Sequence, residues 1–330
     1  MKKYLFNPDK KFFKANLHSH STVSDGKYTP EELKKIYMDK GYSVFAYTDH
    51  EVFVPHNELS DENFLALNGY EYELIEEKSE EKPTNRVRKA CHLCLIAKES
   101  DVTRQVCWHG RVWGNALQIL DKLDYDRENP PYIPVYSGEG ITDVIQTAKK
   151  AGFFVTYNHP AWSLEDMADI AECHGMDALE IYNTNTAIRG WEAYCPYIYE
   201  SMVRRGERIG CIAADDCHRD EHFFGGFTMI SASDLNYRTI TKALEDGDYY
   251  ASTGPEIKEL YFEDGRIYVK TNMPITIKAN YGSRYAEMHH EVSETSFPVR
   301  EDDIFVRITL IDEKGKCANT RAYFIDELYN

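Results

Sequence analysis

The chain has 330 residues, of which 42% are hydrophobic and 28% charged, and its formal net charge at pH 7 is −17. This length accommodates one large domain and a small one. So acidic a chain is not expected to hold nucleic acid along an extended surface, because that needs a basic face. No apolar run follows the first three residues and no stretch approaches a membrane span, so we expect a cytoplasmic protein with no membrane partner.

The first strand-like run covers residues 12–17 and ends in two histidines, His18 and His20. Side chains at positions i and i+2 of a strand point to the same face, so both imidazoles can reach one cation. Asp25 and Gly26 follow in the next turn. The pair therefore predicts half of a metal site.

A histidine or a carboxylate ends, or lies within, nearly every later strand-like run. These residues are Asp49 and His50 after 42–48, Glu71 after 64–70, His92 within 90–97, His159 after 153–158, and Asp216 and His218 after 209–214. One such ending arises by chance, but a repeat in strand order indicates one shared site.

Helices are expected between these strands. Thr29 is a candidate N-cap, Pro30 takes the first helical position, Glu32 lies three residues after the cap, and Gly41 ends the helix. Similar patterns predict helices over 141–151, 164–173, 191–205 and 237–245. Strands and helices therefore alternate through most of the chain.

This alternation predicts an α/β fold with parallel strands joined by crossover helices. Ligands at the carboxyl ends of so many strands have to converge, and a closed ring of strands brings them together better than a line does. We therefore expect an irregular (β/α) barrel, with an open doubly wound sheet as the alternative.

The pattern changes near residue 254, where strands continue without helices. Asp264 and Gly265 stand between two alternating runs, which is typical of a β-hairpin. Further strands are expected over 275–279, 304–311 and 322–325. The sequence thus predicts a large domain over 1–253 and a small antiparallel β domain over 254–330.

Taken together, these motifs resemble the PHP family, named for polymerase and histidinol phosphatase. The motifs are His18-x-His20, Asp25-Gly26, Thr48-Asp49-His50, Gly69-x-Glu71, His92, Asn158-His159-Pro160 and Asp216-x-His218. The resemblance implies a distorted (β/α)7 barrel, a TIM-like fold that holds up to three metal ions, and hydrolysis of phosphate esters. Residues 249–255 and the β-rich tail are similar to a branch that also includes carbamate and ester hydrolases.

The resemblance also implies how the ligands are shared among two or three divalent metal ions. The first metal would take His18, His20, Glu71 and Asp216; the second would take Glu71, His92 and His159; the third would take Asp25, His50 and His218. Asp25 stands where many members of the family have histidine. The ligand set is complete, which argues against a metal-free copy of the fold.

The chemistry of these residues favours the same activity. Mixed imidazole and carboxylate ligands suit zinc, manganese or iron. Two cations that share a carboxylate turn a bridging water into hydroxide at neutral pH, and this hydroxide would attack the phosphorus of a small phosphorylated substrate, such as a nucleotide or a sugar phosphate. The expected catalytic residues are Glu71, Asp216, His218 and Asp25, of which His218 or Asp25 could hold the third metal or protonate the leaving group.

Other polar residues are weaker candidates. Arg189 follows a strand end, Arg111 lies in a long segment between strand patterns, and His222 lies near His218; each is a candidate substrate contact. Asp49 either orients His50 or caps a turn. Two other functions stay open, which are hydrolysis of a carboxylic ester or carbamate by the same metal cluster and a binding module without catalysis.

Overall fold

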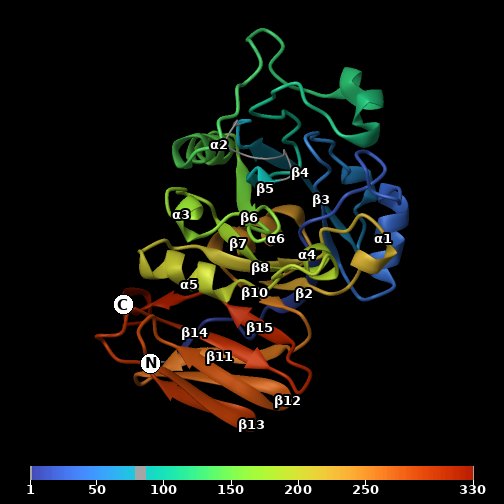
Figure 1. The fold of residues 1–330 in the computed structure, drawn as a ribbon. Coiled ribbons are helices and arrows are strands. Elements are labelled where there is room, and N and C mark those ends of the chain that lie inside the picture. Colours follow the sequence, from blue (N-terminus) through green and yellow to red (C-terminus); the bar gives the residue numbers. More distant parts are fainter. Residues whose placement is uncertain (1, 79–86, 330) are drawn as a thin grey trace.

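The structure is a computed structural model that describes residues 2–78 and 87–329. It is a mixed α/β protein built on one large sheet (Figure 1). The strands that carry the predicted ligands follow one another in that sheet. They are β2 (Lys11–Asn16), β3 (Val44–Tyr47), β4 (Leu65–Ile75), β5 (Ala90–Ala97), β6 (Phe153–Asn158), β7 (Ala178–Asn183) and β8 (Gly210–Ala214).

The expectation of parallel strands throughout is wrong at β5. Strands β2, β3 and β4 are parallel, as are β6, β7 and β8, but β5 runs antiparallel to both β4 and β6. A parallel pair needs a crossover, usually a helix, and the sequence has no helical pattern between β4 and β5. The two strands therefore pair antiparallel.

The carboxyl ends of the first and last of these strands are joined by backbone hydrogen bonds. The Asp216 N–H donates to the His18 carbonyl and the His20 N–H donates to the Cys217 carbonyl, each at 3.0 Å. In the described residues, however, no ladder joins β8 to β2, because β2 pairs with β9 (Phe227–Ala232) instead. The mixed α/β class is confirmed, and the closed (β/α)7 barrel stays a prediction.

Three predicted helices are confirmed, namely α1 (Pro30–Met38), α2 (Gly138–Lys150) and α6 (Tyr237–Asp246). The capping box at the start of α1 is present, since the Thr29 and Glu32 side chains each accept a hydrogen bond from the other residue's backbone N–H. None of the helices in the described residues has both the length and the hydropathy needed to cross a bilayer.

Two predicted helices are shorter than expected. Only α3 (Met167–Ile170) forms within 164–173, because Leu164 has a positive φ of 63° and Asp166 is the N-cap. Within 191–205, α5 (Pro196–Arg204) begins at Pro196, which occupies its first turn. A further short helix, α4 (Thr184–Ile188), follows β7 directly.

The C-terminal strands continue the same sheet, and the predicted hairpin at Asp264–Gly265 is present. Strand β15 pairs with β10, and β1 pairs with β11, so both chain ends lie in the lower part of Figure 1. A domain boundary at residue 254 stays a prediction. These elements are β1 (Lys3–Tyr4), β10 (Tyr249–Ser252), β11 (Ile257–Glu263), β12 (Arg266–Asn280), β13 (Ala286–Pro298), β14 (Phe305–Ile311), β15 (Cys317–Thr320), β16 (Tyr323–Phe324) and α7 (Ile325–Tyr329).

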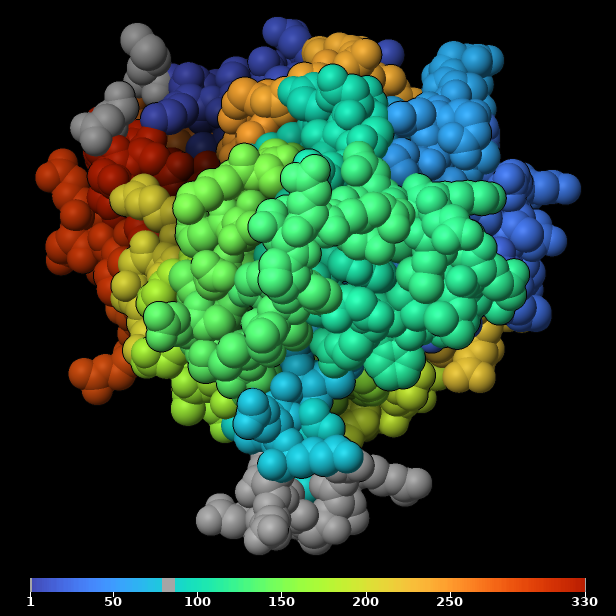
Figure 2. All heavy atoms as spheres, turned by 90° about the horizontal axis from the view of Figure 1, so that it is seen from above, coloured from blue at the N-terminus to red at the C-terminus, as the bar shows by residue number. Residues whose placement is uncertain are grey.

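Residues 98–137, between β5 and α2, form a long segment that we call the insertion. It includes a 3-10 helix over Gly114–Lys122. Viewed from above, the insertion spreads over the top of the molecule (Figure 2). Backbone contacts hold it there, since the Asn115 N–H donates to the Ser24 carbonyl at 2.7 Å. A Cβ on Gly114 would lie 2.1 Å from the same carbonyl, so this close approach requires glycine.

Glu165 is a buried carboxyl group behind β6. Its Oε1 accepts hydrogen bonds from the hydroxyl groups of Tyr157 at 2.7 Å and Tyr136 at 2.9 Å. Burial raises the pKa of Glu165 to about 8, whereas the unfolded chain loses this proton near its ordinary pKa of about 4.3. The folded state therefore binds one more proton between these values, and the stability that this group contributes falls as the pH rises through that window.

Glu165→Gln is expected to remove this pH dependence. At pH 9 the variant should be more stable than the wild type by on the order of a few kcal/mol, and at pH 4 it should lack that advantage. Urea unfolding at both pH values measures the difference, with the exposed Glu172→Gln as the control. An equal effect of Glu165→Gln at both pH values would show that folding does not raise the pKa of Glu165.

Candidate metal centre

Most of the side chains predicted at the strand ends line one pocket of about 210 Å³, and His18 and His20 contact its carboxylates from behind. Glu71 on β4 and Asp216 after β8 lie at its base, and both are almost fully buried. Residues from the insertion, from the loop after β6 and from α4 with its C-cap complete the wall. The lining residues are Asp25, His50, Glu71, Glu73, His92, Trp113, His159, Trp162, Asn185, Arg189, Asp216 and His218.

Glu71 lies among five imidazole rings. Its Oε1 is 2.9 Å from Nδ1 of His92 and 3.1 Å from Nε2 of both His18 and His159. Its Oε2 is 3.0 Å from Nδ1 of His50 and 3.3 Å from Nε2 of His20. Burial alone would raise the pKa of Glu71, but these imidazoles hold it well below the usual range. The carboxylate is therefore ionised and can be shared between two cations.

Asp216 forms the other side of the base and has a positive φ of 51°. Its Oδ1 is 3.1 Å from Nε2 of His20 and 3.4 Å from Nδ1 of His218. Its Oδ2 accepts a hydrogen bond from the Asn185 amide at 3.0 Å. Asp25 is more exposed and lies at the mouth, with its Oδ1 3.6 Å from Nε2 of His218. The carboxylates of Glu71 and Asp216 thus lie deep in the centre, and that of Asp25 lies at its open side.

These side chains fit divalent cations. Nε2 of His18 and Nε2 of His20 face each other at 3.3 Å, which suits two lone pairs directed at a common cation. Oε2 of Glu71 and Nδ1 of His50 are buried and lie 3.0 Å apart without the geometry of a hydrogen bond, and neither atom has another hydrogen bond within the described residues, although buried polar atoms normally have one.

Four groups of atoms lie close enough together to hold a metal ion, with all atoms of a group within 4.8 Å of one another. They are His20, Asp25, His50 and His218; His18, His159 and Asp216; His18, Glu71 and Cys94; and His50, Glu71 and His92. All nine predicted ligands belong to at least one group. How they are divided among individual metals, and how many metals bind, stay predictions.

Sequence reasoning missed Glu180, a fully buried carboxylate on β7. Its Oε1 is 3.0 Å from Nδ1 of His18, and its Oε2 accepts hydrogen bonds from the His159 N–H and the Asn183 amide, each at 2.9 Å. A carboxylate on the outer nitrogen of a ligand histidine fixes which nitrogen faces the metal. A glutamate inside the otherwise apolar run of β7 was the available signal.

Asp49 does not orient His50, which was one of its two expected roles. Its carboxylate instead accepts four hydrogen bonds from the backbone and hydroxyl groups of Ser21 and Ser24, at 2.7 to 3.0 Å. Asp49 therefore shapes the loop that presents Asp25. The reason for this difference from the prediction is local. Ser21 and Ser24 together offer Asp49 more hydrogen-bond donors than the single ring nitrogen of His50 does.

Of the three candidate substrate contacts, the structure brings only Arg189 to the pocket. Its Nε donates to Oδ1 of Asn185 at 2.8 Å, and the guanidinium lies 6.0 Å from the Trp162 ring. Arg111 donates to the Glu73 carbonyl at 2.7 Å and does not line the pocket. His222 is buried behind His218, whose N–H donates to its Nδ1 at 3.3 Å. We keep a direct substrate contact as a proposal for Arg189 alone.

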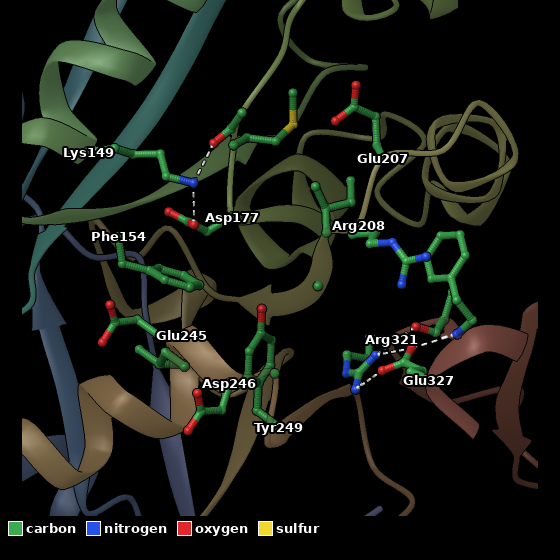
Figure 3. Close-up of a pocket in the computed structure, with 18 residues that line it drawn as sticks. Lys149, Phe154, Asp177, Glu207, Arg208, Glu245, Asp246, Tyr249, Arg321 and Glu327 are labelled. Carbon is green, nitrogen blue, oxygen red and sulfur yellow. Dashed lines mark hydrogen bonds and ion pairs between the residues drawn. The ribbon is translucent and has the colours of Figure 1, made fainter. Parts of the chain in front are cut away.

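A larger cavity of about 370 Å³ lies at the opposite ends of the strands, where Phe154 is the second residue of β6 and Arg208 precedes β8 (Figure 3). None of the described residues in its wall is a histidine. Lys149 is paired with Asp177 at 2.7 Å, and Arg321 makes two contacts of 2.9 Å with Glu327. Because its cations have partners and it lacks a metal-ligand set, the smaller pocket is the candidate functional site.

No protein-family model matches this chain, and a comparison with curated proteins found no match. Among solved structures, a two-domain protein from Bacteroides vulgatus containing a predicted PHP-like metal-dependent phosphoesterase is 13% identical, with 95% of this chain and 96% of that chain covered and a TM-score of 0.44. An amidohydrolase from Chromobacterium violaceum is 15% identical over 62% of this chain and 87% of its own, with a TM-score of 0.37.

The lesion-specific endonuclease EndoQ from Pyrococcus furiosus is also similar, at 14% identity over 72% of this chain and 56% of its own, with a TM-score of 0.42. Its presence contradicts our expectation that no extended nucleic-acid surface exists. That expectation used the net charge of the whole chain, whereas a nucleic acid is held by the local field of one site. The resemblance to the PHP family that the sequence motifs indicate thus recurs among solved structures, at low sequence identity.

Proposed function

We propose that the protein is a metal-dependent hydrolase of phosphate esters. The observation that carries this proposal is the pocket itself, in which Glu71, Asp216 and four histidines lie beside the guanidinium of Arg189, while His18 and His20 contact the two carboxylates from behind. Ligands that come from β2, β4, β5, β6 and β8 also support the closed barrel that we infer for these strands. The metal ligands alone suit hydrolysis of several ester types, and the arginine favours a phosphate group over a carboxylic ester.

Divalent cations held by these residues would supply a Lewis acid and lower the pKa of a bound water molecule. The chain itself contributes orientation and charge. Glu71 and Asp216 are buried anions that hold the cations at the base of the pocket. Asp25 and His218 lie at its open side, with side chains 39% and 17% exposed, where one of them can pass a proton to the leaving alcohol.

Arg189 and two tryptophans define where a substrate would lie. Arg189 donates through Nε to Asn185, which leaves its terminal nitrogens for phosphate oxygens. Trp113 from the insertion and Trp162 after β6 line the same pocket. A pocket of about 210 Å³ holds a phosphate group and a small part of the alcohol. These features support a small phosphorylated substrate, such as a nucleotide or a sugar phosphate.

Phosphate release tests the proposal. The chain is loaded with Mn²⁺ or Zn²⁺ and incubated with mononucleotides, sugar phosphates and a short oligonucleotide, with a chelated sample as the control. Metal-dependent release is the expected result. If the loaded protein hydrolyses p-nitrophenyl acetate or a carbamate and none of the phosphate esters, the proposal is wrong and the carboxylic ester alternative holds.

Arg189→Met is expected to raise KM for the best phosphate substrate by roughly 10- to 100-fold, because a charged hydrogen bond contributes about 1.5 to 3 kcal/mol. Bound metal should stay unchanged, since Arg189 contacts no ligand in the described contacts. Arg238→Met, which removes an exposed arginine on α6, is the matched control. Unchanged KM in Arg189→Met would show that another group holds the phosphate.

A further inference from the structure

Glu73 lies two residues after Glu71 on β4, and its side chain is directed at a candidate metal ligand. Nε2 of His92 lies 3.2 Å from Oε1 of Glu73, and Nδ1 of His92 lies 2.9 Å from Oε1 of Glu71. His92 is therefore held between two carboxylates. With its proton on Nε2, the ring presents the lone pair of Nδ1 to the metal centre.

The backbone of Glu73 is held by side chains in place of a neighbouring strand. Strand β3 pairs with β4 as far as Asn68 and a single bridge joins His50 to Glu71, so in the described part of the chain this edge of β4 has no strand partner at Glu73. The Glu73 N–H donates to Oε1 of Glu51 at 3.1 Å, and the Glu73 carbonyl accepts from Nη2 of Arg111 at 2.7 Å. Both backbone groups of Glu73 thus depend on charged side chains from other segments.

Two of the side chains around Glu73 come from the insertion. Nε2 of His109 donates to Oε2 of Glu51 at 2.7 Å, and Nε of Arg111 donates to Nδ1 of His109 at 3.3 Å. The Arg111 guanidinium also lies 3.8 Å from Oε2 of Glu73 and 3.9 Å from Oε1 of Glu51. We call Glu51, His109 and Arg111 the clamp on Glu73.

The residues of the clamp depend on one another because the Glu51 carboxylate among them is buried. Glu51 is fully buried with a positive φ of 62°, and His109 and Arg111 are the cationic or donor groups that face its carboxylate. A buried carboxylate that loses its partner is strongly destabilised. Loss of Arg111 would therefore remove the donor to the Glu73 carbonyl and a cation near both Glu51 and Glu73, and Glu73 contacts His92.

We propose that the insertion positions the His92 metal ligand, with the clamp holding Glu73 and Glu73 holding the His92 ring. The inference rests on the proposed metal centre and adds a structural task to a segment whose sequence suggested only substrate contact. Glu73 and Arg111 are positioning residues, because they act through His92. Loss of such an outer carboxylate typically lowers metal affinity by about 10- to 100-fold.

Mn²⁺ binding to the metal-stripped full chain, measured by isothermal titration calorimetry, tests this inference. Glu73→Gln and Arg111→Met should each weaken one class of sites by about 10- to 100-fold and leave the other sites unchanged. Arg111→Lys should lie between Arg111→Met and the wild type, because lysine keeps the charge and loses the planar fork. Arg104→Met is the matched control, since Arg104 is an exposed residue of the same insertion that faces Asp126.

The double variant Glu73→Gln/Arg111→Met distinguishes positioning through Glu73 from two separate effects. Because Arg111 acts through Glu73, the double variant should bind Mn²⁺ about as weakly as Glu73→Gln alone. Losses that multiply, or Mn²⁺ affinities equal to the wild type, would overturn the inference. If circular dichroism shows that Glu73→Gln does not fold, Arg111→Met gives the same test. The Arg111 side chain is 40% exposed, so we expect its replacement to be tolerated by the fold.

The outcome for the metal ligand is separate from the outcome for the proposed function. A wild-type chain that binds Mn²⁺ but hydrolyses no phosphate ester contradicts the proposed function, and the variant affinities still decide the role of the clamp. Where hydrolysis is present, kcat should fall in Glu73→Gln while KM stays within about twofold. The reason is that Glu73 is expected to act through His92 and the bound metal, and not through substrate binding.

Discussion

Glu71→Gln is expected to abolish metal-dependent hydrolysis and to lower the amount of bound metal by at least one ion per chain. Glu71 belongs to two of the four groups of ligand atoms, and its two oxygens face five imidazoles. An amide replaces one of these oxygens by a donor and removes the charge. Because a catalytic cation contributes several kcal/mol to the barrier, kcat/KM should fall by roughly 10³-fold or more.

Metal content by inductively coupled plasma mass spectrometry and kcat/KM on the best substrate check this prediction together. Glu58→Gln is the matched control, because Glu58 also faces a histidine, His56 at 3.4 Å, but is exposed and lies outside the pocket. Circular dichroism confirms that the variant is folded. Full turnover by a folded Glu71→Gln protein would show that the chemistry takes place elsewhere.

Asp215→Ala is expected to have the largest effect on stability. The Asp215 side chain is fully buried and accepts five hydrogen bonds, from the hydroxyl groups of Tyr37 and Thr184 and from the backbone N–H groups of residues 224–226, at 2.6 to 3.0 Å. Removal of the carboxylate leaves these donors without a partner. Each unpaired buried donor costs about 1 to 3 kcal/mol, and with partial relaxation the loss should be about 3 to 5 kcal/mol.

Urea unfolding measures this loss as a shift in the midpoint at constant slope. Asp234→Ala, at an exposed position before α6, serves as the control and should change the stability by less than about 0.5 kcal/mol. Because Asp216 follows directly and its N–H is bonded to His18, we also expect weaker metal binding in Asp215→Ala. A stability change below about 1 kcal/mol would mean that the loop over 224–226 finds other acceptors.

The metal ligands could be predicted from the sequence because their signal is local. His18 and His20 share a face through their i, i+2 spacing, and Asp216 and His218 repeat that spacing after β8. Each of these side chains stands at a strand end, and strand ends follow from short apolar runs. The structure brings these four side chains into the groups of atoms that could hold a metal ion, and their role as ligands stays a prediction.

The supporting residues could not be predicted in the same way, because their partners are distant in the chain. His18 and Glu180 are separated by 162 positions along the chain, and Glu73 and Arg111 by 38 positions, with β5 between them in the sequence. Only its charge distinguishes Glu180 from the other residues of its strand in the sequence. The direction of β5 was mispredicted for a related reason, since strand pairing depends on the connection and the neighbours.

The sequence by itself determined the mixed α/β class, the main helices with their caps, and which side chains form the candidate metal centre, because caps, apolar periodicity and strand-end positions are set by neighbours within a few residues. Only the tertiary structure decided the antiparallel position of β5, the contacts of Glu180 and Glu73 with ligand histidines, and the place of Arg189 beside the pocket. These features require backbone segments far apart in the chain to be packed against one another, and no local pattern records that packing.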